Sequence, residues 1–359
     1  MVKDVQRSIY NGRKLKLEIF GASHAPEIGV KASGLKGKEF SINELQEFLD
    51  RRKPKNTAYS TKRLEGDKVE FIKGVRDEKI KGDFVAVIKN QVQNSKDYSS
   101  LIKTPRPAHA DYVAYTKYGD SFDYRGGGKF SGRMTAPMCI AGGILKQVLK
   151  KQGIEINAFI RSIGSVDGKG YNDIDIEKFD FNALDKNFPV LNSADSEKMN
   201  AEIESARQDQ NSVGGVIECV ITGVPVGAGE YMFDSIESVI SSLMFAVPAV
   251  KGIEFGSGFE IAKMHGSDAN DSFYYDGEKV KTKTNHNGGI NGGMANGMPI
   301  TFRVAIKPTP SIAKEQDTIN LADKTNVKLK IEGRHDSCIV PRAVAVIEAV
   351  SAIAIYDCI

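Results

Sequence analysis

The sequence has few cysteines, and their spacing excludes the common structural metal sites. Cys139, Cys219, Cys338 and Cys358 are far apart in the chain of 359 residues, and they form no C-x-x-C pair and no Cys/His ligand pattern. Most of them lie among apolar neighbours, which predicts buried free thiols. We therefore expect a protein without a metal.

The sequence also lacks long apolar runs and a large excess of either charge. Its first residues contain no apolar signal core, and no stretch approaches the roughly 18 uncharged apolar residues that span a membrane. The 49 Lys+Arg nearly balance the 46 Asp+Glu, with no basic stripe interleaved with aromatic residues. We expect a globular, cytoplasmic protein that binds neither membranes nor nucleic acid.

A dinucleotide-binding fingerprint is absent, because no strand-borne G-x-G-x-x-G leads into a helix. Glycine itself is abundant, with 35 residues, a larger share than the roughly 7% average. The glycines cluster at 126–128, 214–215, 256–258 and 288–297, and such runs bring backbone N–H groups close to a ligand. The Gly/Asn run precedes an expected strand, which predicts a connection between core elements rather than a flexible linker.

The apolar periodicity predicts a mixture of helices and strands in one domain spanning residues 1–359. A helix is expected to begin after Ser41, whose side chain can cap it together with Glu44. Other helices are expected at 136–150, 235–244 and 342–355. Strands are expected at 16–20, 69–72, 84–88, 215–220 and 301–306. The polar segment at about 165–210 is expected to be a surface excursion of the same domain.

Two histidines and several arginines indicate chemistry on an anionic substrate. His24 and His109 lie in polar, small-residue motifs, and histidine titrates near neutrality, so the pair suggests proton transfer. Arg133 and Arg334 each follow a glycine just before an expected helix. A guanidinium beside free helix N–H donors suits a phosphate or a carboxylate.

In order and spacing, these motifs resemble the chorismate synthase family nearly from end to end. The matching segments are 20–24, 51–54, 106–111, 117–119, 123–128, 131–133, 211–215, 248–252, 288–290, 307–309 and 333–336. The resemblance implies an α+β fold, a β-α-β sandwich, that assembles as a homotetramer. It also implies binding of reduced FMN (FMNH2) beside 5-enolpyruvylshikimate 3-phosphate. Phosphate leaves C3 and a hydrogen leaves C6 with anti geometry, which gives chorismate without net redox change, at the end of the shikimate pathway.

The resemblance also assigns roles to individual residues. His24 matches the histidine that neutralises the leaving phosphate, His109 the one placed against the flavin ring, and Asp336 an aspartate near flavin N5. The arginines that match the substrate-anion site are Arg52, Arg63, Arg106, Arg133 and Arg342. The positions that match the FMN site are Lys129, Phe130, Ser131, Ala249, Gly292, Lys307, Pro308, Thr309, Pro310, Ser311 and Arg334.

Several positions depart from the commonest family pattern. Ala22 stands where Glu or Thr is usual, and residues 129–134 follow a form found in one bacterial branch. Ala25 and Ala108 replace glycines beside the two histidines, so a positive φ there would be strained. Ala58 replaces a basic residue associated with intrinsic flavin reduction, which predicts a monofunctional enzyme that needs an external flavin reductant.

Two other functions remain open from the sequence alone. One is a flavoprotein oxidoreductase that has lost the elimination, and it should consume nicotinamide in proportion to product. The other is a non-catalytic relative that binds a phospholigand or RNA. The joint presence of His24, His109, Arg133 and Asp336 favours the lyase.

Overall fold

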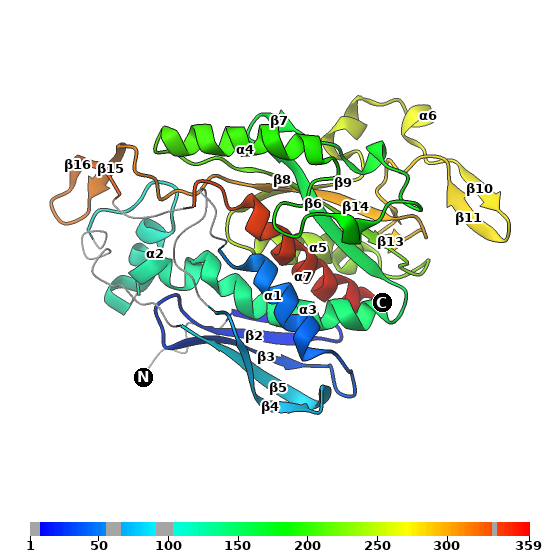
Figure 1. Cartoon of the computed structure of the whole chain (residues 1–359), viewed down its shortest axis with the longest axis horizontal. Coiled ribbons are helices and arrows are strands. Elements are labelled where there is room, and N and C mark those ends of the chain that lie inside the picture. Colours follow the sequence, from blue (N-terminus) through cyan, green and yellow to red (C-terminus); the bar gives the residue numbers. More distant parts are fainter. Residues whose placement is uncertain (1–7, 55–65, 91–102, 122, 332–335) are drawn as a thin grey trace.

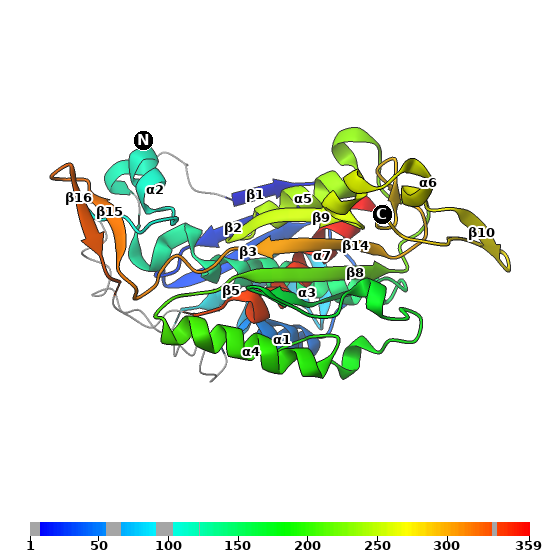
Figure 2. The ribbon, with the colours of Figure 1, turned by 90° about the horizontal axis from the view of Figure 1, so that it is seen from above.

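Two antiparallel sheets of five strands enclose a layer of helices (Figures 1 and 2). The computed structural model describes residues 8–54, 66–90, 103–121, 123–331 and 336–359. The first sheet has the order β1-β2-β3-β5-β4, with β1 Ser8–Asn11, β2 Lys16–Gly21, β3 Glu27–Ser33, β5 Lys79–Lys89 and β4 Val69–Arg76. The second has the order β7-β6-β8-β14-β9, with β7 Val166–Asp167, β6 Glu155–Ile163, β8 Gly215–Thr222, β14 Ile300–Ile306 and β9 Val250–Phe255.

The helices between the sheets are α1 Ile42–Arg52, α3 Thr135–Lys150, α5 Ile236–Phe245 and α7 Val340–Cys358. Helix α3 packs on β3 and β5 of the first sheet, and α7 packs on β6 and β8 of the second. Helices α3 and α7 also pack on each other, which joins the two halves through one hydrophobic core. This arrangement is the β-α-β sandwich that the family resemblance implied.

The remaining elements lie around this sandwich. The peripheral helices are α2 Asp111–Tyr118, α4 Ser193–Gln208 and α6 Gly266–Ala269. Three hairpins complete the chain: β10 Phe273–Asp276 with β11 Lys279–Thr282, β12 Ile290–Asn291 with β13 Met294–Ala295, and β15 Gln316–Asn320 with β16 Thr325–Leu329. The β10–β11 and β15–β16 hairpins project at opposite ends of the molecule (Figure 1).

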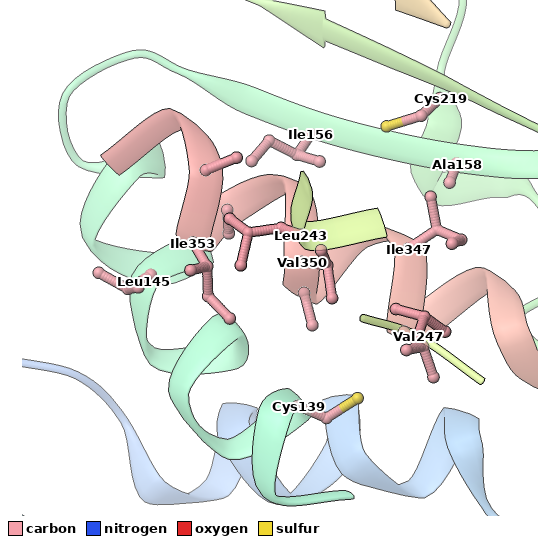
Figure 3. Packing of buried hydrophobic residues seen from close by; sticks show 14 of the residues in the cluster. Cys139, Leu145, Ile156, Ala158, Cys219, Leu243, Val247, Ile347, Val350 and Ile353 are labelled. Atoms are coloured by element: carbon pink, nitrogen blue, oxygen red, sulfur yellow. The ribbon is translucent and has the colours of Figure 1, made fainter. Parts of the chain in front are cut away.

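Helix α7 is buried along its whole length except at Arg342 and Ala343, near its start. Its apolar side chains Ile347, Val350 and Ile353 face α3, α5 and β6 (Figure 3). A glycine makes the close approach to α3 possible, because a Cβ at Gly142 would lie 2.3 Å from the carbonyl oxygen of Ala349. The position of α7 is therefore fixed by packing. This matters for function because its first turns carry site residues.

The expected elements are present, and most extend beyond their predicted ends. Ser41 accepts a hydrogen bond from the Glu44 N–H, as the capping pattern predicted. The four cysteines are free and buried, and burial raises the pKa of each thiol to about 12. The 288–297 run is ordered around β12 and β13, with Ile290 and Ala295 buried, so it connects core elements as expected.

The polar segment at 165–210 contains helix α4, which the sequence analysis did not predict. Only Met199 and Ile203 of this helix are buried, and two apolar positions in 16 residues give a weak helical period.

In the described part of the chain, no helix has the length and apolar character that crossing a bilayer requires. The same residues contain no cluster of His, Cys, Asp or Glu suited to a metal ion.

Candidate active site

A cavity of about 1000 Å³ lies where the first residues of α7, the entry to α3 and the end of α1 meet. Its volume is at the upper end of the roughly 300–1,000 Å³ of typical ligand pockets, so it can hold more than one small molecule. The predicted site residues that line it are Arg52, Arg106, His109, Lys129, Phe130, Ser131, Arg133, Ala249, Lys307, Thr309, Pro310, Ser311, Asp336 and Arg342.

The triple glycine at 126–128 packs against both predicted histidines. All three glycines have positive φ, at 57°, 81° and 54°. A Cβ at Gly126 would lie 2.3 Å from Cε1 of His24, and one at Gly127 would lie 3.2 Å from Nε2 of His109. Two adjacent glycines of one loop therefore contact the imidazoles of His24 and His109. Side chains at these positions would displace the histidines.

His109 is oriented by the start of helix α2. Its Nδ1 lies 2.6 Å from Oδ1 of Asp111, the first residue of that helix. Arg106 donates to both oxygens of the same carboxylate, at 2.7 and 2.8 Å, and also to Oγ of Ser311. Burial alone would raise the pKa of Asp111, but hydrogen bonds from Arg106 and His109 hold it well below its usual range. An ionised Asp111 keeps the proton of His109 on Nδ1 and leaves Nε2 facing the glycine loop.

Three guanidinium groups also line the cavity. Arg52 and Arg133 each donate to a different oxygen of Asp67, which is 2% exposed. Arg342 donates to Asp336 at 2.5 Å, and its Nε donates to the backbone carbonyl of Arg52. Arg133 precedes α3 and Arg342 lies in the first turn of α7, so two helix N-termini add positive potential here. The arrangement suits a ligand with several anionic groups.

The remaining wall combines cations with apolar side chains. Val247, Ile339 and Val346 line it from the α5–β9 connection and from α7. Burial lowers the pKa of Lys129, and burial together with the charge of Lys251 lowers that of Lys307. A flat apolar ring with a phosphate tail could contact both kinds of group.

Comparisons with known proteins agree over nearly the whole chain. The family model described as chorismate synthase matches residues 15–359. The chain belongs to the chorismate synthase family. It is 42% identical to the chorismate synthase of Korarchaeum cryptofilum over 350 residues and 43% identical to that of Thermococcus kodakarensis over 349, with 96% of each chain covered in both comparisons. A solved chorismate synthase structure superposes with a TM-score of 0.74 at 25% identity, covering 97% of this chain and 92% of the other.

The activity follows from this membership. The chain is a chorismate synthase, a lyase of the shikimate pathway, and the open alternatives of an oxidoreductase or a binding module are set aside. The neighbour structure also supports the α+β sandwich described above.

Some residues assigned by resemblance to chorismate synthases are not among the described residues that line the cavity. Arg63 and Arg334 fall outside the described residues. His24 is 4% exposed and lies behind Ser23 and Gly126, which do line the cavity. Pro308 and Gly292 do not line it either. The backbone of Gly292 belongs to the turn between β12 and β13, which is held against the start of α5 by the Gly293 carbonyl.

Arg106, which the resemblance assigns to a substrate anion, lines the cavity and also has partners within the protein. Its guanidinium group donates hydrogen bonds to Asp111 and Ser311, and the residue is 5% exposed. Bonds from Nε, Nη1 and Nη2 leave little donor capacity for a ligand. Through Asp111, Arg106 also supports the position of His109.

Sequence reasoning missed two carboxylates and the apolar wall. Asp111 carried a signal, since it lies two residues after His109 at the start of a helix. Asp67 carried almost none, because its partners are 15 and 66 positions away in the sequence. The wall residues Val247, Ile339 and Val346 resemble ordinary core residues in any sequence reading.

The departure at Ala108 has a measurable consequence. Ala108 has a φ of +56°, whereas Ala25 is not among the residues with positive φ. Such a conformation costs a non-glycine residue about 1–3 kcal/mol, partly offset by the greater freedom of glycine in the unfolded chain. We expect Ala108→Gly to raise the free energy of unfolding by about 1 kcal/mol. Chemical denaturation measures this, with Ala25→Gly as the matched control, which should lower stability. The same sign for both variants would contradict the interpretation.

Proposed function

We propose that this cavity binds 5-enolpyruvylshikimate 3-phosphate beside reduced FMN and that the residues around it catalyse the anti elimination of phosphate. The observation that supports this most directly is that His109 lines the same cavity as Arg52, Arg133 and Arg342, and that the glycine loop at 126–128 packs on both His24 and His109. The C3–O bond breaks with its electron pair leaving on phosphate, the hydrogen at C6 leaves as a proton, and a conjugated diene remains.

The cationic side of the cavity supports binding of the substrate. One phosphate and two carboxylates need several donors, and guanidinium groups meet planar anions with paired hydrogen bonds. Arg342 can turn from Asp336 toward a ligand, since both side chains line the cavity. The N-termini of α3 and α7 supply further positive potential at the same place.

The other side fits a flavin mononucleotide. Thr309 has a buried hydroxyl without a hydrogen-bond partner among the described residues, which suits a polar ligand group at this wall. Lys307 lies beside it and donates to the Ala108 carbonyl at 2.5 Å, close to the His109 motif. Val247 and Ile339 offer an apolar face for the ring. When bound, reduced flavin supplies transient electron density to the substrate and takes no part in the net balance.

The two histidines and Asp336 stabilise charge and assist proton transfer in this proposal. Asp111 holds His109 with Nε2 toward the cavity side, so the imidazole can stabilise an anionic ring beside it. His24 is buried behind Ser23 and Gly126, and it neutralises the leaving phosphate once these two residues move aside. Asp336 assists removal of the C6 proton through the flavin once Arg342 engages the substrate.

The remaining parts of the proposal concern the setting of the enzyme. It works as a cytoplasmic homotetramer, and it is monofunctional, so an external reductant supplies FMNH2. Ala58, on which the second statement rests, lies outside the described residues.

An anaerobic assay tests the proposed function. Purified protein with photoreduced FMN should release phosphate and form chorismate in a 1:1 ratio over many turnovers, and oxidised FMN should give none. NADPH with oxidised FMN but no reductase should also give none, because the enzyme cannot reduce its flavin. Turnover with oxidised FMN alone would overturn the flavin role. Rapid flavin reduction by NADPH in the purified protein would overturn the monofunctional assignment.

A further inference from the structure

The buried carboxylate of Asp67 is the least expected charge near the cavity. It does not line the cavity, and its two oxygens are taken by two different arginines that do. Its backbone has a φ of +44°, which few non-glycine residues adopt. Both the burial of this charge and the positive φ of its backbone therefore cost free energy in the folded state.

The backbone around Asp67 is held by the side chain of Gln46 in helix α1 through two hydrogen bonds. Nε2 of Gln46 donates to the Asp67 carbonyl at 3.2 Å, and Oε1 of Gln46 accepts from the Val69 N–H at 3.2 Å. The segment that carries the carboxylate is thus fixed to the same helix that carries Arg52. Asn90 holds the second arginine, because its Oδ1 accepts from Nε of Arg133 at 3.0 Å.

The charges explain why a carboxylate is needed here. Arg52 and Arg133 are almost fully buried and share one binding partner, so without Asp67 their charges would repel each other. Burial would raise the pKa of Asp67, but the charges of the two arginines lower it, which keeps the carboxylate ionised at neutral pH. Each arginine donates to Asp67 through one terminal nitrogen, and both arginines line the cavity.

We propose that Asp67 is a positioning residue that fixes Arg52 and Arg133 for the anionic groups of the substrate. It acts through these arginines and touches no reacting atom. Because Asp67 is itself an anion next to the site, its charge lowers the affinity of the cavity for an anion such as inorganic phosphate. At the same time it holds the two guanidinium groups in the positions that the substrate requires. This inference rests on the proposed function of the cavity.

The substitution Asp67→Asn removes the charge with little change in shape, and asparagine tolerates positive φ. The amide can accept from one arginine but points N–H groups at the other. We expect kcat to fall about tenfold or more, because misplaced binding groups lose catalytic alignment. We expect inorganic phosphate to bind about tenfold tighter, because one negative charge has left a buried cationic cluster. Steady-state kinetics and the thermal shift caused by phosphate measure the two effects.

A second buried triad provides the matched control. Glu348 accepts from Arg51, the neighbour of Arg52, and from Lys146, and this group opens on a separate cavity of about 230 Å³. Glu348→Gln therefore removes a buried carboxylate between two cations without touching the substrate site. It should lower stability but leave kcat and phosphate affinity within about twofold of the parent values, since distant sites act independently.

The outcomes separate clearly. A lower kcat with tighter phosphate binding in Asp67→Asn supports the proposal. An unchanged kcat, or a joint loss of kcat and phosphate affinity as for a general support of the fold, overturns it. If Asp67→Asn does not fold, Gln46→Leu carries the same test with a smaller loss of kcat. Turnover by the parent protein keeps this test apart from the proposed function, because a parent without turnover refutes that function, while phosphate affinity still reports on Asp67.

Discussion

Replacing Asp111 by asparagine is expected to lower kcat about 100-fold, as when a carboxylate that orients a catalytic histidine is lost. In the parent protein Asp111 accepts from Nδ1 of His109 and from two nitrogens of Arg106. An amide can accept one of these bonds but presents N–H groups to the others. The imidazole is then free to change its tautomer and to turn away from Gly127, and the flavin side of the site loses its fixed donor.

Stopped-flow measurement of single turnovers with photoreduced FMN checks this effect on chemistry rather than on product release. Asp209→Asn is the matched control, since Asp209 pairs with Lys314 on the surface and should leave the rate unchanged. FMN binding by Asp111→Asn, measured by equilibrium dialysis, should weaken far less than kcat falls. A variant with the parent rate would show that His109 needs no orientation by Asp111.

Removing the Glu348 carboxylate is expected to cost about 3–5 kcal/mol of unfolding free energy at pH 7, as when one partner of a buried ion pair is deleted. Glu348 is held by Arg51, Lys146 and the Ala158 N–H. Burial would raise its pKa, but the charges of Lys146 and Arg51 lower it from 4.5 to about 2. The loss should therefore depend strongly on pH.

The sign follows from the lowered pKa in the folded state. Stability contributed by ionisation of Glu348 is fully present above its unfolded pKa and is lost as the pH falls from about 5 to about 2. At about 1.4 kcal/mol for each pKa unit, this contribution is about 3 kcal/mol. Urea unfolding of the parent and Glu348→Gln at several pH values measures it, and the difference between them should shrink toward pH 2. A difference independent of pH would contradict the assignment.

The sequence predicted the framework of this fold well, for physical reasons that are local. Ser41 and Glu44 form a cap within one turn, and the apolar runs that became β8, β14 and α7 are long enough to show their period. Helix α4 was missed because only Met199 and Ile203 are buried. The strain expected beside the histidines was present at Ala108 but not at Ala25, since backbone φ depends on the contacts of each loop.

The sequence could predict which residues belong to the candidate site, but not which of them contact each other. The motifs identified the histidines and arginines, whereas pairing is a property of the folded chain. The contacts of Arg106 with Asp111 and Ser311, for example, could not be predicted from the motif that contains it. Asp67 had no recognisable pattern, because its partner Arg133 is brought to it by the packing of α3 between α1 and the first sheet.

A crystal structure of the protein with oxidised FMN and 5-enolpyruvylshikimate 3-phosphate tests the central claim most directly. The cavity between α3 and α7 should hold both molecules, with the flavin ring against Val247 and Ile339 and the substrate anions on Arg52, Arg133 and Arg342. His109 should contact the ring through Nε2 while Asp111 retains Nδ1. Density for either ligand outside this cavity, or substrate anions bound without these arginines, would contradict the assignment of the active site.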